Sequence, residues 1–196
     1  MKLWPEFLLL AACGGGGGHS APKPTADSPW AIGAPDAHSS GPSFDIPTQG
    51  SINYVTQATG SLEGKHSITL RYRVDMADDV RIFPPSMPEG PSIITLYFQR
   101  KGDDWSGQGK YAFYRWYATS SSQMPITAGE HEITAAFTDK WTAIEAGASN
   151  ELSQAFPDAL PNAGRVGFVL GGGTGYGHGV TASGPARFTI ISFTIA

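Results

Sequence analysis

The sequence predicts an all-β protein, an antiparallel jelly-roll β-sandwich with one or two short helices in a connection. Charged residues make up only 15% of the 196 residues, whereas Gly and Pro number 25 and 15. Sparse charge together with many turn-forming residues favours strands joined by turns over helices. From Gly50 onward, short segments that alternate apolar and polar residues are separated by turn clusters at the intervals typical of a sandwich.

The composition changes near residue 47 and divides the chain into three parts. Residues 1–12 have the character of a signal peptide, and residues 13–46 are dominated by Gly, Ala, Ser and Pro. A segment of that composition buries too little apolar surface to offset the entropy of ordering, so we expect a disordered, flexible tether. Within it, only the segment 30–32 is a candidate for contact with the domain. Residues 47–196 are expected to form the sandwich.

Strand patterns are strongest in the first half of the domain. In one segment, apolar residues alternate with Arg71 and Arg73, which therefore lie on the opposite face of that strand. In a later one, Tyr97 and Gln99 lie opposite the apolar residues in the same way. Three segments show this alternation: residues 51–59, 66–75 and 92–100.

The segment 110–119, KYAFYRWYAT, combines five aromatic residues with one arginine and is expected to be the central strand. As a strand it would place Tyr111, Phe113, Arg115 and Tyr117 on one face, opposite Tyr114 and Trp116. The pattern leaves open which face is core. We favour the first face, which would leave Trp116 exposed in a shallow trough between two alanines.

The second half adds three strands and a connection. Residues 131–138, 165–170 and 186–195 have strand patterns, and the last is apolar on both faces, which favours a central position. Residues 141–156 are compatible with helix. There, Ser149 or Asn150 could cap a short helix over 151–156, which Pro157 would end.

The N-terminal residues Leu10-Ala11-Ala12-Cys13 resemble the lipobox of bacterial lipoproteins, preceded by Lys2 and a short apolar run. The resemblance implies cleavage before Cys13, lipidation of its sulfur and amine, and, with Gly14 after the cysteine, an outer-membrane location. Cys13 is the chain's one cysteine and has no partner for an intramolecular disulfide. Outside this region, no sequence segment has the roughly 20 apolar residues of a membrane-spanning helix. The lipid would then be the anchor.

Two loops are candidates for a binding rim. The glycine-rich segment 171–179 contains His178, and it is followed by no Gly-Lys-Ser/Thr and no helix, which excludes a phosphate loop or a dinucleotide fingerprint. It is either a long loop that needs positive φ angles or the rim of a ligand groove. The loop 101–109 carries Trp105 beside two aspartates, either folded back on the sandwich or exposed for binding.

The sequence contains no motif that fixes an enzymatic activity. It has no G-x-S-x-G elbow, and its adjacent acidic pairs do not define a glycosidase site. A net charge of −4 without a cluster of Lys and Arg argues against a nucleic-acid partner. We expect a non-enzymatic monomer without a cofactor or a side-chain metal site. A structural calcium ion held by backbone carbonyls stays open.

The domain resembles the jelly-roll modules of bacterial carbohydrate-binding proteins in its YAFYRWYA, GDDWSG and ARFTIISFTI segments. This resemblance implies binding of a glycan or cell-envelope polymer, with aromatic faces stacking on sugar rings and polar side chains bonding the hydroxyls. A structural or interaction module without a sugar site and a polysaccharide lyase are the alternatives. The expected ligand-binding residues are Arg71, Arg73, Tyr97, Gln99, Trp105, Trp116 and His178.

Overall fold

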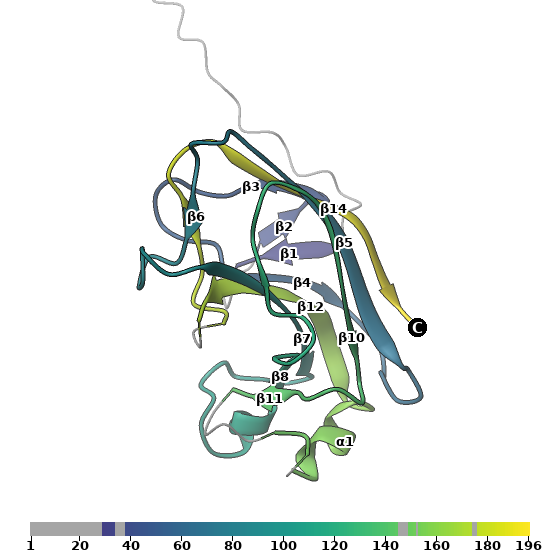
Figure 1. Cartoon of the computed structure of the whole chain (residues 1–196). Helices are drawn as coiled ribbons and strands as arrows, with labels where there is room; N and C mark the ends of the chain where they lie inside the picture. The colour runs from purple at the N-terminus through teal and green to yellow at the C-terminus, as the bar shows by residue number, and fades with distance from the viewer. Residues whose placement is uncertain (1–28, 34–37, 145–148, 152, 174–175) are drawn as a thin grey trace, which may run out of the picture.

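The computed structural model describes residues 29–33, 38–144, 149–151, 153–173 and 176–196. In these residues two antiparallel sheets pack face to face, which confirms the predicted all-β sandwich (Figure 1). The helical content there is one short α-helix, α1 (Ala155–Ala159), and one 3-10 helix (Gly109–Phe113). Among the described residues, no helix is long and apolar enough to cross a membrane.

The strands form one large sheet, one smaller sheet and a short ribbon. The large sheet has the order β11 (Thr142–Ala143), β8 (Arg115–Tyr117), β7 (Ser92–Arg100), β12 (Ala163–Gly172), β4 (Tyr54–Ala58), β1 (Trp30–Ile32), β2 (His38–Ser40), and β9 (Met124–Pro125) also pairs with β7. The smaller sheet has the order β10 (Gly129–Ala136), β5 (Ser67–Met76), β14 (Ala186–Ile195), β3 (Ser43–Asp45). The ribbon joins β6 (Ile82–Phe83) and β13 (Thr181–Ala182).

The strand pairing identifies the sandwich as a jelly roll. Eight strands pair in a nested order, the first with the last and so on inward: β3 with β14, β4 with β12, β5 with β10, and β7 with β8. All four pairings are antiparallel, so the chain follows one long hairpin that is rolled into two sheets. Along these eight strands the chain alternates between the two sheets, except at β7 and β8, which are neighbours in the large sheet, and a single core is enclosed between the sheets.

The core follows the alternation read from the sequence. Ile68, Leu70 and Tyr72 of β5 are fully buried against the apolar residues of β7, whose outward neighbours include Tyr97 and Gln99. Removal of these side chains from water is the main favourable term for folding. β14 lies between β5 and β3, as expected for a terminal strand that is apolar on both faces.

The sandwich begins earlier than the sequence indicated, because β1, β2 and β3 lie inside the segment expected to be a tether. Trp30 packs its ring 6.0 Å from Phe168 and 5.3 Å from Phe193, and Phe44 stacks on Phe188. A few buried apolar residues order this segment although its composition is polar. The boundary at residue 47 is therefore wrong, and the sandwich includes Trp30. Residues 13–28 lie outside the described residues.

The aromatic segment 110–119 is only partly a strand. Its first residues form the 3-10 helix, and only β8 is extended. Trp116 points into the core, has none of its surface exposed, and donates from Nε1 to the Phe113 carbonyl at 2.9 Å. The favoured prediction of an exposed Trp116 is therefore wrong, and Arg115 and Tyr117 take the outward positions. A helical turn does not place alternate residues on opposite faces. The inward position of Trp116 could therefore not be deduced by counting along the segment from Tyr111.

The connection after β11 also differs from the prediction. α1 begins at Ala155, so Pro157 lies in its first turn, where a missing N–H removes no helical hydrogen bond. Asn150 does not cap a helix. Its side chain instead accepts a hydrogen bond from the Trp141 N–H at 2.9 Å and donates to the Asp139 carbonyl at 2.7 Å.

Replacing Trp116 by Ala is expected to lower the free energy of unfolding by about 3–5 kcal/mol, because it empties a large, fully buried site. Ile191→Ala is the matched control, since Ile191 is 42% exposed, and it should change stability by less than about 0.5 kcal/mol. Urea unfolding followed by circular dichroism measures both. Equal, small effects of the two substitutions would contradict the core position of Trp116.

Candidate functional site

The structure brings together three of the predicted ligand-binding residues. Tyr97 and Gln99 occupy outward positions of β7, on the face of the large sheet that is turned away from the core. Trp105, in the loop between β7 and the 3-10 helix, packs against the same face. His178 is exposed in the turn after β12, two residues from Tyr176, whose ring lies 4.9 Å from the Tyr117 ring.

The other three predicted residues lie elsewhere. Arg71 and Arg73 are on β5 of the smaller sheet, where they form exposed ion pairs with Glu132 and Asp75 at 3.4 and 3.0 Å. Exposed pairs of this kind contribute little free energy and leave both arginines solvated. Trp116 belongs to the core. A single site that joins these three residues to Tyr97 is therefore excluded.

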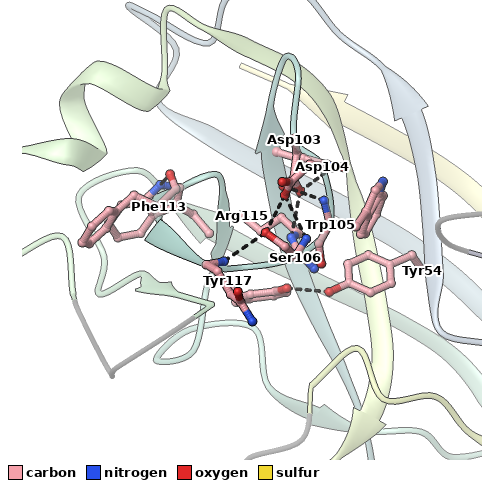
Figure 2. Close-up of polar contacts among 11 residues, drawn as sticks. Tyr54, Asp103, Asp104, Trp105, Ser106, Phe113, Arg115 and Tyr117 are labelled. Atoms are coloured by element: carbon pink, nitrogen blue, oxygen red, sulfur yellow. Dashed lines mark hydrogen bonds and ion pairs between the residues drawn. The ribbon is translucent and has the colours of Figure 1, made fainter. Parts of the chain in front are cut away.

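The outward face of the large sheet carries a buried polar and aromatic cluster. Loop residues cover it, so that side chains on this face are as inaccessible as those of the core: Tyr97 has no exposed surface, and Gln99 and Arg115 have 3% and 4%. We call it the outer-face cluster; its members are Tyr54, Tyr97, Gln99, Asp103, Trp105, Arg115 and Tyr117. Figure 2 labels five of them: Tyr54, Asp103, Trp105, Arg115 and Tyr117.

The ion pair between Asp103 and Arg115 lies at the centre of the outer-face cluster. The Asp103 Oδ2 is 2.8 Å from the Arg115 Nε, and the two side chains are 0% and 5% exposed. The angle at Nε is not that of a hydrogen bond, so this contact is an electrostatic one. Asp103 Oδ2 also accepts from the Gln99 amide at 2.7 Å, and Arg115 Nη2 donates to the Trp105 carbonyl at 2.9 Å. The pair thus ties the loop to β7 and β8.

Trp105 has an unusual backbone conformation. Its φ of 66° is the one positive value at a residue other than glycine in the described part of the chain. For a bulky residue this conformation costs about 1–3 kcal/mol and persists only where the surroundings impose it. Here the Trp105 N–H donates to Asp103 Oδ1 at 3.1 Å, and the Arg115 guanidinium carbon lies 4.9 Å from the centre of the indole ring. The half-buried indole is therefore held in one orientation.

Three tyrosines form the floor beneath Trp105. The hydroxyls of Tyr54 and Tyr117 are 2.5 Å apart and share a hydrogen bond, and the Tyr97 ring meets Tyr54 edge to face (Figure 2 labels Tyr54 and Tyr117). Burial raises the pKa of Tyr97 and of Tyr117 well above the ordinary value of 10.0, and the neighbouring Tyr54 raises them further. Both groups therefore remain neutral phenols at physiological pH.

Polar atoms on β7 remain without a protein partner. The hydroxyls of Thr95 and Tyr97 and the Oε1 of Gln99 are buried and make no hydrogen bond within the described residues, although Tyr97 lies beside Thr56. These residues occupy successive outward positions of one strand. Buried polar atoms normally have partners, since desolvating one without compensation costs about 1–3 kcal/mol. The outward side of β7 therefore carries a row of buried polar atoms whose desolvation is not compensated within the described residues.

A pocket of about 370 Å³ opens beside Trp105 at the end of the outer-face cluster. Its lining combines an indole, an amide and cationic side chains from β7, the following loop and β12. The lining residues are Gln99, Arg100, Lys101, Gly102, Asp103, Trp105, Gly164 and Arg165. Within this group, only Gln99 and Trp105 were predicted as ligand-binding residues.

Some of the missed residues could have been found from the sequence. Arg115 and Tyr117 share a face in the aromatic segment, and Asp103 stands two residues before Trp105. Tyr54 and Arg165 carried no comparable signal, because their pairing with this face depends on the order of strands in the sheet. The glycine segment was correctly expected to contain positive φ angles, at Gly173, Gly177 and Gly179 in its described part.

Comparison of the chain with protein-family models, with curated proteins and with solved structures gave no match. Within the residues that the structure describes, no three His, Cys, Asp or Glu side chains are grouped so that they could hold a metal ion. The functional argument therefore rests on the outer-face cluster and on the pocket beside it.

Asp103→Asn is expected to lower the free energy of unfolding by about 3 kcal/mol, because it leaves the Arg115 charge buried without a counter-charge. Asp104→Asn is the matched control: Asp104 is exposed, bonds only Ser106 in the turn, and should cost much less. Chemical denaturation measures both. The double substitution Asp103→Leu with Arg115→Met should recover most of the loss. If Asp103→Asn and Asp104→Asn have equal effects, the ion pair does not organise the loop.

Proposed function

We propose that this protein is a membrane-anchored extracytoplasmic lipoprotein whose β-sandwich binds a carbohydrate or cell-envelope polymer. The proposed site is the pocket beside Trp105. The observation that supports it is an indole held in a strained backbone conformation, beside a pocket lined by amide and cationic side chains. Binding rather than catalysis is the role that we assign to it.

The chemistry of this pocket suits a sugar. An indole offers a flat apolar face with few torsions to freeze, and the apolar C–H groups of a pyranose ring can stack on it. Gln99 and Arg165 add directional polar groups for hydroxyls at the edge of that face. Since Asp103 and Arg115 fix Trp105 before a ligand arrives, binding would freeze few additional degrees of freedom.

The proposed location follows from the lipobox resemblance. Lipidation of Cys13 would anchor the chain to an outer membrane, and the segment from there to Trp30 would separate the sandwich from the bilayer. Several acyl chains together give stable anchoring where a single chain binds only marginally. We further propose that the anchored domain acts as a monomer.

A structural module without a sugar site is the second candidate function. The near-complete burial of Tyr97, Gln99 and Tyr117 favours it, because these side chains already pack together beneath the loops. A polysaccharide lyase is less favoured. A lyase needs a base, and the raised pKa of Tyr97 and Tyr117 opposes formation of a tyrosinate.

Trp105→Asn should weaken polysaccharide binding by about tenfold, because it removes one stacking platform worth about 1.4 kcal/mol. Asn tolerates positive φ, so the loop is expected to keep its shape. Trp105→Phe is the matched control, because it keeps an aromatic face and should retain most of the affinity. Thermal shift and titration calorimetry across a panel of neutral and acidic polysaccharides measure binding. No response of the wild type to any polymer would favour the structural module.

Cys13→Ser is expected to release the protein from membranes, since it removes the proposed site of lipidation. Fractionation of cells that express each form shows the distribution, and metabolic labelling with palmitate shows the modification. Ser20→Ala, in the same N-terminal segment, is the control and should remain membrane-bound. Absence of label from the wild type would refute the lipoprotein part of the proposal.

A further inference from the structure

We propose that the pocket beside Trp105 selects a sugar residue that carries a carboxylate, so that the ligand is an acidic, uronate-containing glycan. This inference rests on the proposed carbohydrate-binding function and specifies its substrate class. It follows from the positive charges of Lys101 and Arg165, from the bulge in β12 that turns Arg165 outward, and from the Gln99 Oε1, which has no hydrogen-bond partner among the described residues.

The pocket is positively charged although the chain as a whole carries −4. Lys101 and Arg165 line it, and neither has a carboxylate partner within ion-pair distance in the described residues. The one acidic lining residue, Asp103, is already paired with Arg115. Arg100 also lines the pocket, but its guanidinium lies over the Tyr114 ring, at 4.7 Å. Arg165 donates from Nη1 to the Thr56 hydroxyl at 3.1 Å, a neutral partner that leaves its charge uncompensated. Lys101 and Arg165 thus offer two positive charges without a carboxylate partner to an anionic ligand.

An irregularity in β12 sets the side of the sheet on which Arg165 lies. The register shifts between Ala163 and Arg165, so that Gly164 is an extra residue opposite β7. Without this bulge, Ala163 and Arg165 would point to the same side, whereas Ala163 is in the core and Arg165 is exposed. A Cβ on Gly164 would lie 2.6 Å from the Lys101 Cγ, so the glycine gives room for the Lys101 stem. The bulge thus turns Arg165 away from the core, the glycine leaves room for Lys101, and both residues line the pocket.

Gln99 provides the feature that a simple anion site would not need. It lines the pocket and is 3% exposed, its Nε2 donates to Asp103, and its buried Oε1 has no hydrogen-bond partner among the described residues. An amide oxygen accepts a hydrogen bond and therefore repels a bare anion, but it suits a hydroxyl donor. The pocket thus offers cations to a carboxylate, an acceptor to a hydroxyl group and an indole to the face of a sugar ring. This combination matches a uronic acid residue better than it matches phosphate or a neutral sugar.

Calorimetric titration with matched polymers tests this inference. The probes are polygalacturonate, alginate and hyaluronan, each compared with its carboxyl-reduced form, which keeps the sugar backbone and removes the charge. We expect at least one acidic polymer to bind at least tenfold more tightly than its reduced form. The double substitution Lys101→Gln with Arg165→Gln should abolish this difference. Lys65→Gln with Lys140→Gln removes two exposed cations elsewhere and should preserve it.

The outcomes separate this inference from the function on which it rests. Equal binding of acidic and reduced polymers, or a preference that survives loss of Lys101 and Arg165, overturns acidic selectivity and leaves sugar binding intact. Binding of dextran sulfate with no binding of any uronate polymer shows nonspecific anion attraction and overturns the inference as well. No binding of any polymer, with identical results for Trp105→Asn and wild type, overturns both proposals.

Discussion

The buried ion pair of Asp103 and Arg115 is the constraint on which the outer face of the large sheet depends. Two charges without access to water are stable only when they meet each other and further hydrogen-bond partners. Gln99, the backbone N–H of Trp105 and its carbonyl supply those partners. In consequence, one loop, one side-chain amide and one indole are fixed by the same contact. The position of the pocket wall follows directly from this electrostatic requirement.

The strand order of the jelly roll explains which side chains gather on the outward face of the large sheet. Since β7, β8, β12 and β4 all turn one set of side chains to the core, their remaining positions must gather on the opposite side of the same sheet. Tyr117 and Tyr54 lie on strands that are three places apart, about 14 Å at normal strand spacing. Their hydroxyls nevertheless share a hydrogen bond, so both side chains reach across the intervening strands. The Tyr97 ring lies within contact of both, 5.1 Å from Tyr54 and 6.0 Å from Tyr117.

Much of the fold could be predicted from the sequence, and the site only in part. The alternation of apolar and polar residues identified the inward and outward faces of β5 and β7. A long strand that is buried on one side requires this alternation. It could not show that β5 and β7 belong to different sheets, so Arg71 and Tyr97 were wrongly joined in one site. Trp116 was misplaced because a 3-10 turn breaks the alternation. Residues 30–32 were a candidate for contact with the domain but were assigned to the tether, because the average composition of the segment does not show that the Trp30 ring packs in the core.

The hydroxyl contact between Tyr54 and Tyr117 has a consequence for how the protein becomes functional. β4 and β8 are not neighbours, so β7 and β12 must first pair between them, and the two tyrosines are 63 positions apart in the chain. Contacts of such long sequence separation form late, because loop closure precedes any gain from them. A chain that is only partly folded therefore lacks the floor of the outer-face cluster. The wall of the pocket beside Trp105 is complete only once the strands between the two tyrosines have paired.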